Sequence, residues 1–292
     1  MRDYLSLRFQ RVVVGGETAE LVPVVKGVPQ GSVLGPTLFN IYLAHLPDLV
    51  SFQRVQIPSF ADDVTLHSVA NSINEAVSEV TLAVSSVGCN LAERGLRINF
   101  KKSCAMALGK GSSADSFDGI KYDQDFIIPA VPCTKLLAIM VDIRLSWKEH
   151  VNYIAEKVGR KIGAFHRASR MLNVQARRMY LISVTLPDFG YCCALFACSL
   201  CSADRKKLEA LERRAVRICS GADRTAPCDP LYDNLQIVPL RLRWLWRILC
   251  LTFQAVKGCD PMQLMTYLYI SVTHIILVVK RPLLFFRLEL LM

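Results

Sequence analysis

The sequence predicts a mixed α/β domain followed by an all-α domain, and three observations support this prediction. Short apolar runs separated by turns with Gly or Pro fill residues 1–147, as in a sheet of short strands. From Lys148 onward, apolar residues recur every three or four positions, which is typical of amphipathic helices. The charge also changes there: residues 1–147 hold 13 Lys and Arg against 14 Asp and Glu, whereas residues 148–292 hold 22 against 11.

The first half alternates predicted strands with predicted helices. Strands are expected on both sides of Gly15-Gly16 and of Ala61-Asp62-Asp63, where apolar runs flank turn residues. The clearest helix covers residues 71–94, because its apolar residues are spaced by three and four positions and Gly95 supplies a C-terminal stop. The other predicted segments are a helix at 37–46, a hairpin formed by 96–100 and 104–108, and strands within 126–145.

The second half is predicted to form helices with basic faces. Segments 157–172 and 204–220 each place apolar residues on one face and Lys and Arg mostly elsewhere. Such a face suits a polyanion, most commonly nucleic acid, although a solvated surface can have the same composition. The candidate contacts with nucleic-acid phosphates are Lys157, Arg160, Lys161, Arg167, Arg170, Arg177 and Arg178.

Cysteine usage and the two ends of the chain indicate an intracellular protein, nuclear or cytoplasmic, rather than a secreted one. Eleven cysteines are scattered, mostly in apolar stretches, and residues 1–11 do not form a secretory signal. The tail at 265–292 contains an apolar run shorter than the ~20 residues that a membrane span needs, so no membrane contact is expected. A buried core segment is the favoured interpretation of this run. The alternative is foreign sequence from a truncated or frame-shifted gene copy.

Two adjacent carboxylates, Asp62 and Asp63, lie in a predicted apolar hairpin. Neighbouring carboxylates repel each other unless a cation or hydrogen-bond donors offset their charge. A divalent cation would do so, and hard oxygen ligands favour Mg²⁺. Taken alone, the dipeptide favours an ordinary surface turn, in which aspartate is common. The surrounding sequence therefore has to decide between the two interpretations.

Four sequence blocks surround and include this hairpin. They read Gly27-Val-Pro-Gln-Gly-Ser-Val-Leu-Gly-Pro36, Phe60-Ala-Asp-Asp63, Gly95-Leu-Arg-Ile-Asn-Phe-Lys-Lys-Ser103 and Lys135-Leu-Leu-Ala-Ile-Met-Val-Asp-Ile-Arg-Leu-Ser-Trp147. In content and order they resemble blocks of the reverse transcriptases of non-LTR retrotransposons, the jockey-like elements in particular. The resemblance covers residues 4–264, and a chance match of four ordered blocks is a poor explanation.

The resemblance implies a fold and an activity. Residues 1–147 would form a palm of the split βαβ, ferredoxin-like kind, which includes the primer-grip region. Residues 148–264 would form an all-α, basic thumb or connection, and the tail at 265–292 keeps an uncertain status. The implied enzyme is an RNA-directed DNA polymerase, which transfers a nucleotide from a dNTP to the 3′-hydroxyl of a DNA primer on an RNA template.

The resemblance also implies roles for individual residues. Two Mg²⁺ ions would be held by Asp62, Asp63 and a third carboxylate. Lys102 would be the general acid that protonates the leaving pyrophosphate. The alternative interpretation is that Lys102 is an ordinary lysine in a hairpin turn. Trp147 and His150 are expected to be packing residues. The candidate contacts with nucleotide and template are Pro29, Gln30, Gly31, Ser32 and Phe60.

The chain departs from the family pattern in two places. In this family the third carboxylate lies on an earlier strand, in a Phe-x-Asp block upstream of the block that begins here at Gly27. Asp3 is the only aspartate before Gly27 in this sequence, and it is not part of such a block. We therefore expect an incomplete palm that lacks this strand and the fingers, with an unpaired sheet edge and no useful polymerase activity. No endonuclease segment is recognisable either. In the primer-grip block Ala138 replaces a glycine, which predicts local backbone strain.

Three interpretations stay open at this point. The chain is an active reverse transcriptase whose missing strand exists in a longer gene, or a non-catalytic remnant that still binds nucleic acid. The third interpretation, an unrelated α/β interaction protein with an Asp-Asp turn, must explain the four ordered blocks by accident.

Overall fold

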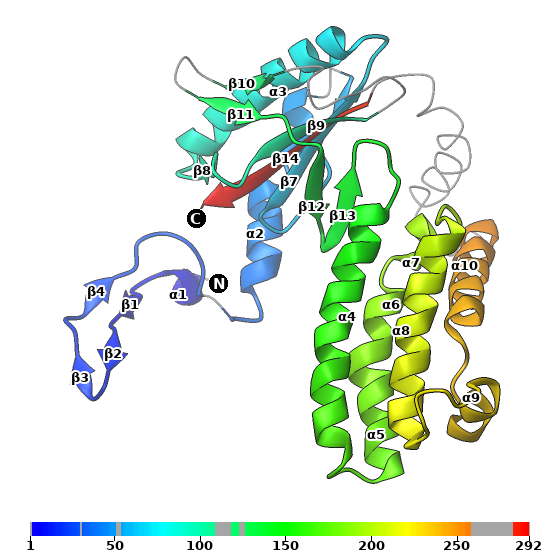
Figure 1. The fold of residues 1–292 in the computed structure, drawn as a ribbon. Helices are drawn as coiled ribbons and strands as arrows, with labels where there is room; N and C mark the ends of the chain where they lie inside the picture. Colours follow the sequence, from blue (N-terminus) through cyan, green and yellow to red (C-terminus); the bar gives the residue numbers. More distant parts are fainter. Residues whose placement is uncertain are drawn as a thin grey trace. The chain divides into compact units, whose positions relative to one another are not determined.

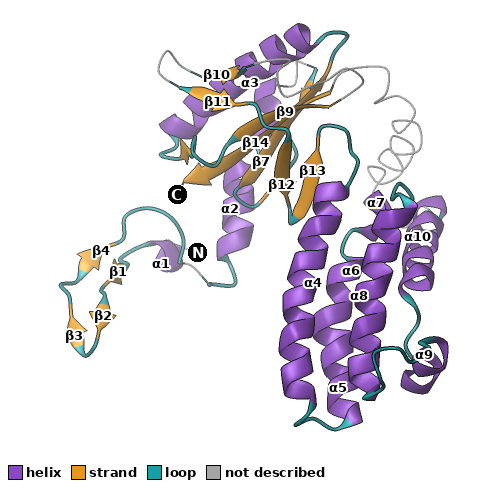
Figure 2. Ribbon diagram, viewed as in Figure 1, coloured by secondary structure: helices purple, strands orange, loops and turns teal. Residues whose placement is uncertain are grey.

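The computed structural model describes residues 2–29, 31–50, 54–108, 118–122, 126–257 and 283–291. Its internal contacts divide the chain into two units (Figure 1). The first unit combines Met1–Ala105 and Phe117–Ala130 with Leu283–Met292, and the second combines Met106–Ser116 with Val131–Pro282. Helices predominate in the second unit, whereas the first holds the largest sheet (Figure 2). The predicted mixed α/β class is therefore confirmed.

The largest sheet has six strands. Its main order is β5-β7-β14-β8, while β6 pairs with β7 and β9 pairs with β14. The first residues of β9 belong to the first unit. The strands are β5 (Val55–Gln56), β6 (Ser59–Phe60), β7 (Asp63–Val69), β8 (Arg97–Ile98), β9 (Cys104–Leu108) and β14 (Leu283–Leu291).

The tail contributes β14 to the middle of this sheet. β14 runs antiparallel to β7, from the pair Leu283↔Val69 to the pair Glu289↔Asp63. On its other side it pairs with β8 through Leu290↔Ile98. Strand β7 is therefore paired with β5, β6 and β14, and residues 265–282 of the tail lie outside the described residues. The hairpin predicted between 96–100 and 104–108 is wrong, because β8 and β9 each pair with β14.

Helix α3 (Ile73–Glu93) packs on the sheet and matches the helix predicted from its periodicity. The side chain of Ser72 caps it by accepting a hydrogen bond from the Glu75 backbone N–H at 3.2 Å. Gly95 ends the turn that follows with a φ of +79°, which a glycine adopts without strain. The residues that α3 buries are Ala76, Val80, Ala83, Val84, Val87, Gly88 and Leu91.

The remaining elements of the first unit are short. A hairpin of β2 and β3 turns at Gly15-Gly16, as predicted, and β1 pairs with β4 around it. The predicted helix at 37–46 is a shorter α-helix, followed by a 3₁₀ turn that contains Pro47. These elements are α1 (Arg2–Leu5), β1 (Phe9–Gln10), β2 (Val13–Val14), β3 (Glu17–Thr18), β4 (Val22–Pro23), α2 (Gly35–Leu43), η1 (Leu46–Val50), β10 (Gly119–Lys121) and β11 (Ile127–Pro129).

From Val131 onward, the second unit consists of a hairpin followed by helices. Its two longest helices, α4 and α8, pack against each other. None of the described helices is long and apolar enough to cross a membrane. The elements are β12 (Cys133–Leu136), β13 (Ile139–Asp142), α4 (Lys148–Ser169), α5 (Val174–Tyr180), η3 (Leu181–Thr185), α6 (Leu186–Gly190), α7 (Cys193–Phe196), α8 (Ser202–Ser220), α9 (Asp229–Leu235) and α10 (Leu240–Val256).

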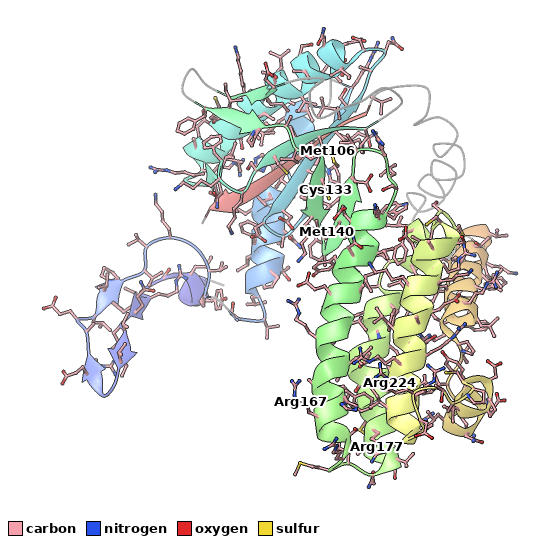
Figure 3. All side chains as sticks on the ribbon, viewed as in Figure 1. Met106, Cys133, Met140, Arg167, Arg177 and Arg224 are labelled. Carbon is pink, nitrogen blue, oxygen red and sulfur yellow. The ribbon has the colours of Figure 1, made fainter. Side chains whose placement is uncertain are left out.

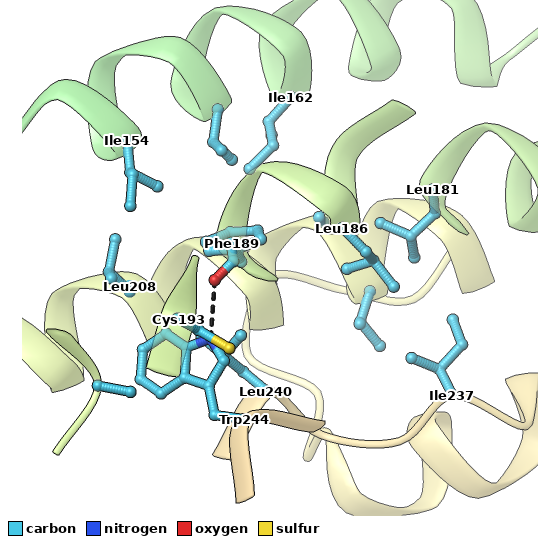
Figure 4. Packing of buried hydrophobic residues seen from close by; sticks show 14 of the residues in the cluster. Ile154, Ile162, Leu181, Leu186, Phe189, Cys193, Leu208, Ile237, Leu240 and Trp244 are labelled. Carbon is cyan, nitrogen blue, oxygen red and sulfur yellow. Dashed lines mark hydrogen bonds between the residues drawn. The ribbon is translucent and has the colours of Figure 1, made fainter. Parts of the chain in front are cut away.

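One apolar core holds these helices together (Figure 4). Phe165, Phe189 and Phe196 are fully buried in it, and burial of each such side chain contributes about 1.5–3 kcal/mol. Trp244 closes the core from α10 and donates its indole N–H to the carbonyl of Phe189 at 2.7 Å. The periodic apolar faces predicted for α4 and α8 are therefore the faces that pack.

A buried carboxylate ties three of these helices to one another. Glu212 of α8 accepts hydrogen bonds from the Tyr232 hydroxyl at 2.9 Å and the Leu240 N–H at 2.9 Å. The Arg243 guanidinium lies 2.6 Å from its other oxygen. Burial raises the pKa of Glu212, and Arg243 opposes that rise. This residue therefore has a structural partner for each oxygen and is not available for catalysis.

Candidate active site and nucleic-acid interface

A tight hairpin presents the two adjacent aspartates. Phe60 of β6 pairs with Asp63 of β7, so Ala61 and Asp62 form a two-residue loop. Ala61 has a φ of +53°, whereas Asp62 is not among the residues with positive φ. This combination is the pattern of a type II′ turn, which strongly favours glycine at its first position. Asp62 is exposed and Asp63 half-buried at the base of the turn.

The hairpin tip carries strain and an exposed aromatic ring. An alanine in the left-handed region costs on the order of 1–3 kcal/mol, and residues of this kind cluster at functional sites. Phe60 is 68% exposed next to the aspartates, although aromatic rings are usually buried. A planar exposed ring is suited to stacking on a nucleotide base. The turn therefore brings two carboxylates and one exposed aromatic ring together.

The sheet brings two further segments to the level of Asp63. Glu289 of β14 stands at the register position opposite Asp63. The next residue, Leu290, pairs with Ile98 of β8. Neighbouring strands lie about 4.8 Å apart, so Asp63 and Ile98 are separated by roughly 10 Å across the sheet. Ile98, in the block that contains Lys102, therefore lies two strands away from Asp63 in nearly the same register of the sheet.

Lys102 lies in the turn between β8 and β9. Its backbone N–H donates to the Asn99 carbonyl at 3.1 Å, and so does that of Ser103 at 3.0 Å. The Ser103 hydroxyl adds a third bond to the same carbonyl at 2.9 Å. Lys101 and Lys102 are both exposed on this tight turn. The role of Lys102 as a proton donor stays a prediction.

The glycine- and proline-rich loop before α2 is held by local contacts. Ser32 accepts a hydrogen bond from the Gly35 N–H at 3.2 Å and donates to the Pro29 carbonyl at 2.8 Å. Its hydroxyl also bonds to that of Tyr4. Gly31 has a φ of +79°, which explains the glycine at that position. Gln30, the fourth predicted contact in this loop, lies outside the described residues.

The two aspartates fit part of a magnesium site. Their side chains are oxygen ligands of the kind that Mg²⁺ prefers, and an exposed turn leaves room for water and substrate oxygens. Within the described residues, no group of three or more His, Cys, Asp or Glu side chains is placed to hold a metal ion. The hairpin by itself would therefore offer two carboxylates of the three that the family resemblance implies for such a site.

The predicted phosphate contacts on α4 differ in their surroundings. Lys157 and Lys161 both lie against Asp188 of α6, at 3.0 and 2.5 Å. Lys161 also donates to the Val184 carbonyl at 2.8 Å. This shared carboxylate offsets part of the positive charge of the two lysines. Arg160 is paired with Glu156 at 3.1 Å, on an exposed surface where such a pair contributes little.

The other predicted contacts lie near the C-terminal end of α4. Arg178 donates to the Leu235 carbonyl at 2.6 Å and so holds the end of α9. Arg167 is exposed. Arg170 and Arg177 line a cavity of about 690 Å³ together with side chains that sequence reasoning did not assign to a site. The additional basic residues around it are His166, Arg214, Arg217 and Arg224.

The primer-grip block forms the β12–β13 hairpin and the start of α4. Leu137 and Ala138 are its two loop residues, with φ of +43° and +67°, so the strain expected at Ala138 is confirmed. Asp142 is buried and accepts hydrogen bonds from the backbone N–H groups of Arg144, Ser146 and Trp147 at 3.0 to 3.1 Å. The aspartate of this block therefore shapes the entry into α4.

Two further residues of this region are packing residues, as expected. Trp147 is 9% exposed and His150 is 2% exposed. The His150 ring packs edge-on against Phe196, with 4.8 Å between the ring centroids. Its Nδ1 accepts a hydrogen bond from the Met140 N–H at 3.3 Å. Both side chains are thus placed in the core of the second unit rather than on its surface.

Comparisons with known proteins agree with the sequence blocks. Residues 1–155 match the family described as "Reverse transcriptase (RNA-dependent DNA polymerase)". The chain is 22% identical over 226 residues to the probable RNA-directed DNA polymerase from transposon X-element of Drosophila melanogaster, which covers 73% of this chain and 24% of the relative. It is 24% identical over 230 residues to the RNA-directed DNA polymerase from mobile element jockey of the same species. This alignment covers 76% of this chain and 25% of the relative.

A third relative extends the comparison to another insect. A retrovirus-related Pol polyprotein from a type-1 retrotransposable element of Nasonia vitripennis is 24% identical over 234 residues, with 77% of this chain and 55% of the relative covered. The chain thus spans about a quarter of the first two relatives and about half of the third. No solved structure matches it. Because the match includes the Asp62–Asp63 hairpin and more than half of the residues, the chain belongs to the reverse transcriptase family.

Proposed function

We propose that this chain supplies the palm hairpin and the thumb of a non-LTR retrotransposon reverse transcriptase. The first unit and the β12–β13 hairpin would act as part of the palm, and the helices from α4 onward as the thumb. The observation that carries the proposal is the tight turn that presents Asp62 and Asp63 beside the exposed ring of Phe60. The substrates would be an RNA template, a DNA primer and a dNTP, and the chain would act inside the cell, in the nucleus or the cytoplasm.

The residues of this chain would have separate tasks in the reaction. Asp62 and Asp63 would hold Mg²⁺, which when bound lowers the pKa of the attacking 3′-hydroxyl and offsets charge on the leaving pyrophosphate. The loop that contains Pro29, Gln30, Gly31 and Ser32 would face template and nucleotide. Phe60 would stack near the primer end, and Lys102 would donate a proton to the pyrophosphate.

A second candidate function is nucleic-acid binding without catalysis. It is favoured by the observation that the described side chains bring only two metal-ligating carboxylates together. With two protein ligands the metal and the reacting atoms would be less well positioned, and small misplacements can cost about 100-fold in rate. We therefore propose that chain 1–292 by itself binds primer–template but extends the primer poorly.

The test is Mg²⁺-dependent extension of a labelled DNA primer on an RNA template by chain 1–292. The variant is Asp62→Ala, and Asp233→Ala is the control because that aspartate is exposed on α9 of the second unit. Extension that is lost in Asp62→Ala but kept in Asp233→Ala would establish the polymerase function.

The remaining outcomes separate the two candidate functions. Salt-sensitive binding of the primer–template without extension would establish the non-catalytic function. Absence of both extension and binding would overturn both proposals.

A further inference from the structure

The strongest unassigned feature is the basic cavity at one end of the helical unit. It has a volume of about 690 Å³ and lies where α4 and α8 end and α5 begins. Arg177 and Arg224 are seen near this end of the unit in Figure 3. No Asp or Glu is among the lining residues. The basic residue types around it are His166, Arg170, Arg177, Arg214, Arg217 and Arg224.

Two of these arginines are held in place by backbone carbonyls. Arg177 donates its Nε–H to the Leu172 carbonyl at 2.9 Å, and Arg217 donates its Nε–H to the Ala226 carbonyl at 2.8 Å. Each guanidinium has five N–H donors, so these bonds orient the group and use only one donor. Gly221 leaves room for this arrangement, because a side chain there would lie 3.1 Å from Nη1 of Arg177.

The protein offsets little of this positive charge. Across the residues that the structure describes, no carboxylate forms an ion pair with any of the five arginines. The C-termini of α4 and α8 each contribute about −0.5 of a charge, so together they offset roughly one positive charge of five. By contrast, Lys157 and Lys161 share the carboxylate of Asp188. Stabilisation of helix ends therefore does not account for the cluster.

We propose that this cavity binds consecutive phosphates of a nucleic-acid backbone, RNA or DNA. Guanidinium groups match phosphate oxygens in two-pronged geometry, and several of them in one cavity of this size suit more than one phosphate. Contacts of this kind recognise the backbone and are independent of base sequence. The inference deepens the proposed function, because it assigns the main phosphate contact of the second unit to this cavity rather than to the lysines of α4.

The test compares two triple variants of chain 1–292 that lose the same charge. The cavity variant is Arg170→Gln, Arg214→Gln and Arg224→Gln, three exposed residues, which leaves the two backbone-bonded arginines intact. The control variant changes three exposed basic residues elsewhere in the same unit: Lys206→Gln, Arg241→Gln and Lys257→Gln. A third variant with Lys at the three cavity positions restores the charge.

Binding of a labelled single-stranded RNA and of a DNA of the same sequence is measured by fluorescence anisotropy over a range of salt concentrations. Each lost phosphate contact lowers the salt slope of binding by about 0.7, so the cavity variant is expected to lose roughly two units of slope and at least about tenfold in affinity. The control should change far less, and the Lys variant should recover most of the slope. A loss on RNA and DNA alike assigns the shared backbone, and a loss on RNA alone assigns the RNA strand.

Equal losses in the cavity and control variants would overturn the inference, and so would an unchanged cavity variant. Unfolding curves of the variants show whether they fold. If the Gln cavity variant does not fold, the Lys variant still decides the test, because it should bind nucleic acid with most of the wild-type salt slope. Primer extension is measured separately. A chain that binds through the cavity but does not extend a primer would keep the inference and remove only the catalytic proposal.

Discussion

At the residue scale, three of the described non-glycine residues with left-handed backbone conformation lie in hairpin loops. Ala61 lies beside the aspartates, and Leu137 and Ala138 form the loop of the primer-grip block. In this conformation a Cβ atom crowds the following carbonyl, which glycine avoids. The sequence comparison predicted strain at one of these positions, Ala138, because a glycine is expected there.

Replacement of Ala138 by glycine should stabilise the second unit. We expect Ala138→Gly to raise the free energy of unfolding by about 1 kcal/mol, because the left-handed penalty is removed. Urea unfolding followed by circular dichroism measures the change. Ala210→Gly is the matched control, since this exposed position inside α8 should lose about 1 kcal/mol through reduced helix propensity. Changes of the same sign in both variants would contradict the assignment of strain to Ala138.

At the element scale, the position of β14 decides whether the first unit has a complete sheet. This strand lies between β7 and β8, far from both in sequence. Without it, β7 would present unpaired backbone groups on one edge, which favours aggregation. Its pairing with β7 therefore stabilises the strand that carries Asp63.

A proline in β14 tests this arrangement. Arg287 pairs with Thr65 in the middle of β7, and a proline there removes a backbone N–H and does not fit a central strand. A lost ladder bond costs about 1 kcal/mol, so amide exchange in β7 should accelerate by roughly fivefold in Arg287→Pro. Hydrogen exchange with mass spectrometry measures it, and Arg287→Val keeps the N–H as a control. If both variants protect β7 equally well, β14 does not belong to the sheet.

At the scale of the whole molecule, the chain consists of two units with different contents. The first contains the aspartate hairpin and the largest sheet, and the second contains the apolar helical core and the arginine cavity. Catalysis and phosphate binding would therefore depend on different units. The stability of each unit can be changed without altering residues of the other.

The second unit should lose stability as the pH falls. Burial lowers the pKa of His150 to about 4 from an ordinary value of 6.5, so the folded unit keeps this ring neutral. The unfolded chain binds the proton first, and the stability that is present above pH 6.5 is lost as the pH falls toward 4. Urea midpoints at pH 7.5 and at about pH 5 should differ less in His150→Leu than in the wild type. His166→Leu, at an exposed position of α4, should behave like the wild type, and a wild-type pH dependence in His150→Leu would disprove the role of His150.

The features that could be predicted from the sequence are those determined by neighbours in the chain. Apolar spacing within α3, α4 and α8 was sufficient to predict these helices and their buried faces. Turn residues predicted the hairpins at Gly15-Gly16 and at Ala61-Asp62. In each case the deciding interaction lies within a few residues, so a local pattern is enough.

The sequence by itself determined the family, the Asp-Asp hairpin and the basic character of the second half. Only the tertiary structure decided three things: that β14 lies beside β7, that Asp188 offsets Lys157 and Lys161, and that arginines from α4, α5, α8 and the loop after it gather in one cavity. These features join residues that are far apart in the chain. Strand pairing uses backbone groups that every sequence has, and charge clusters depend on where separate helices end, so neither leaves a local pattern to detect.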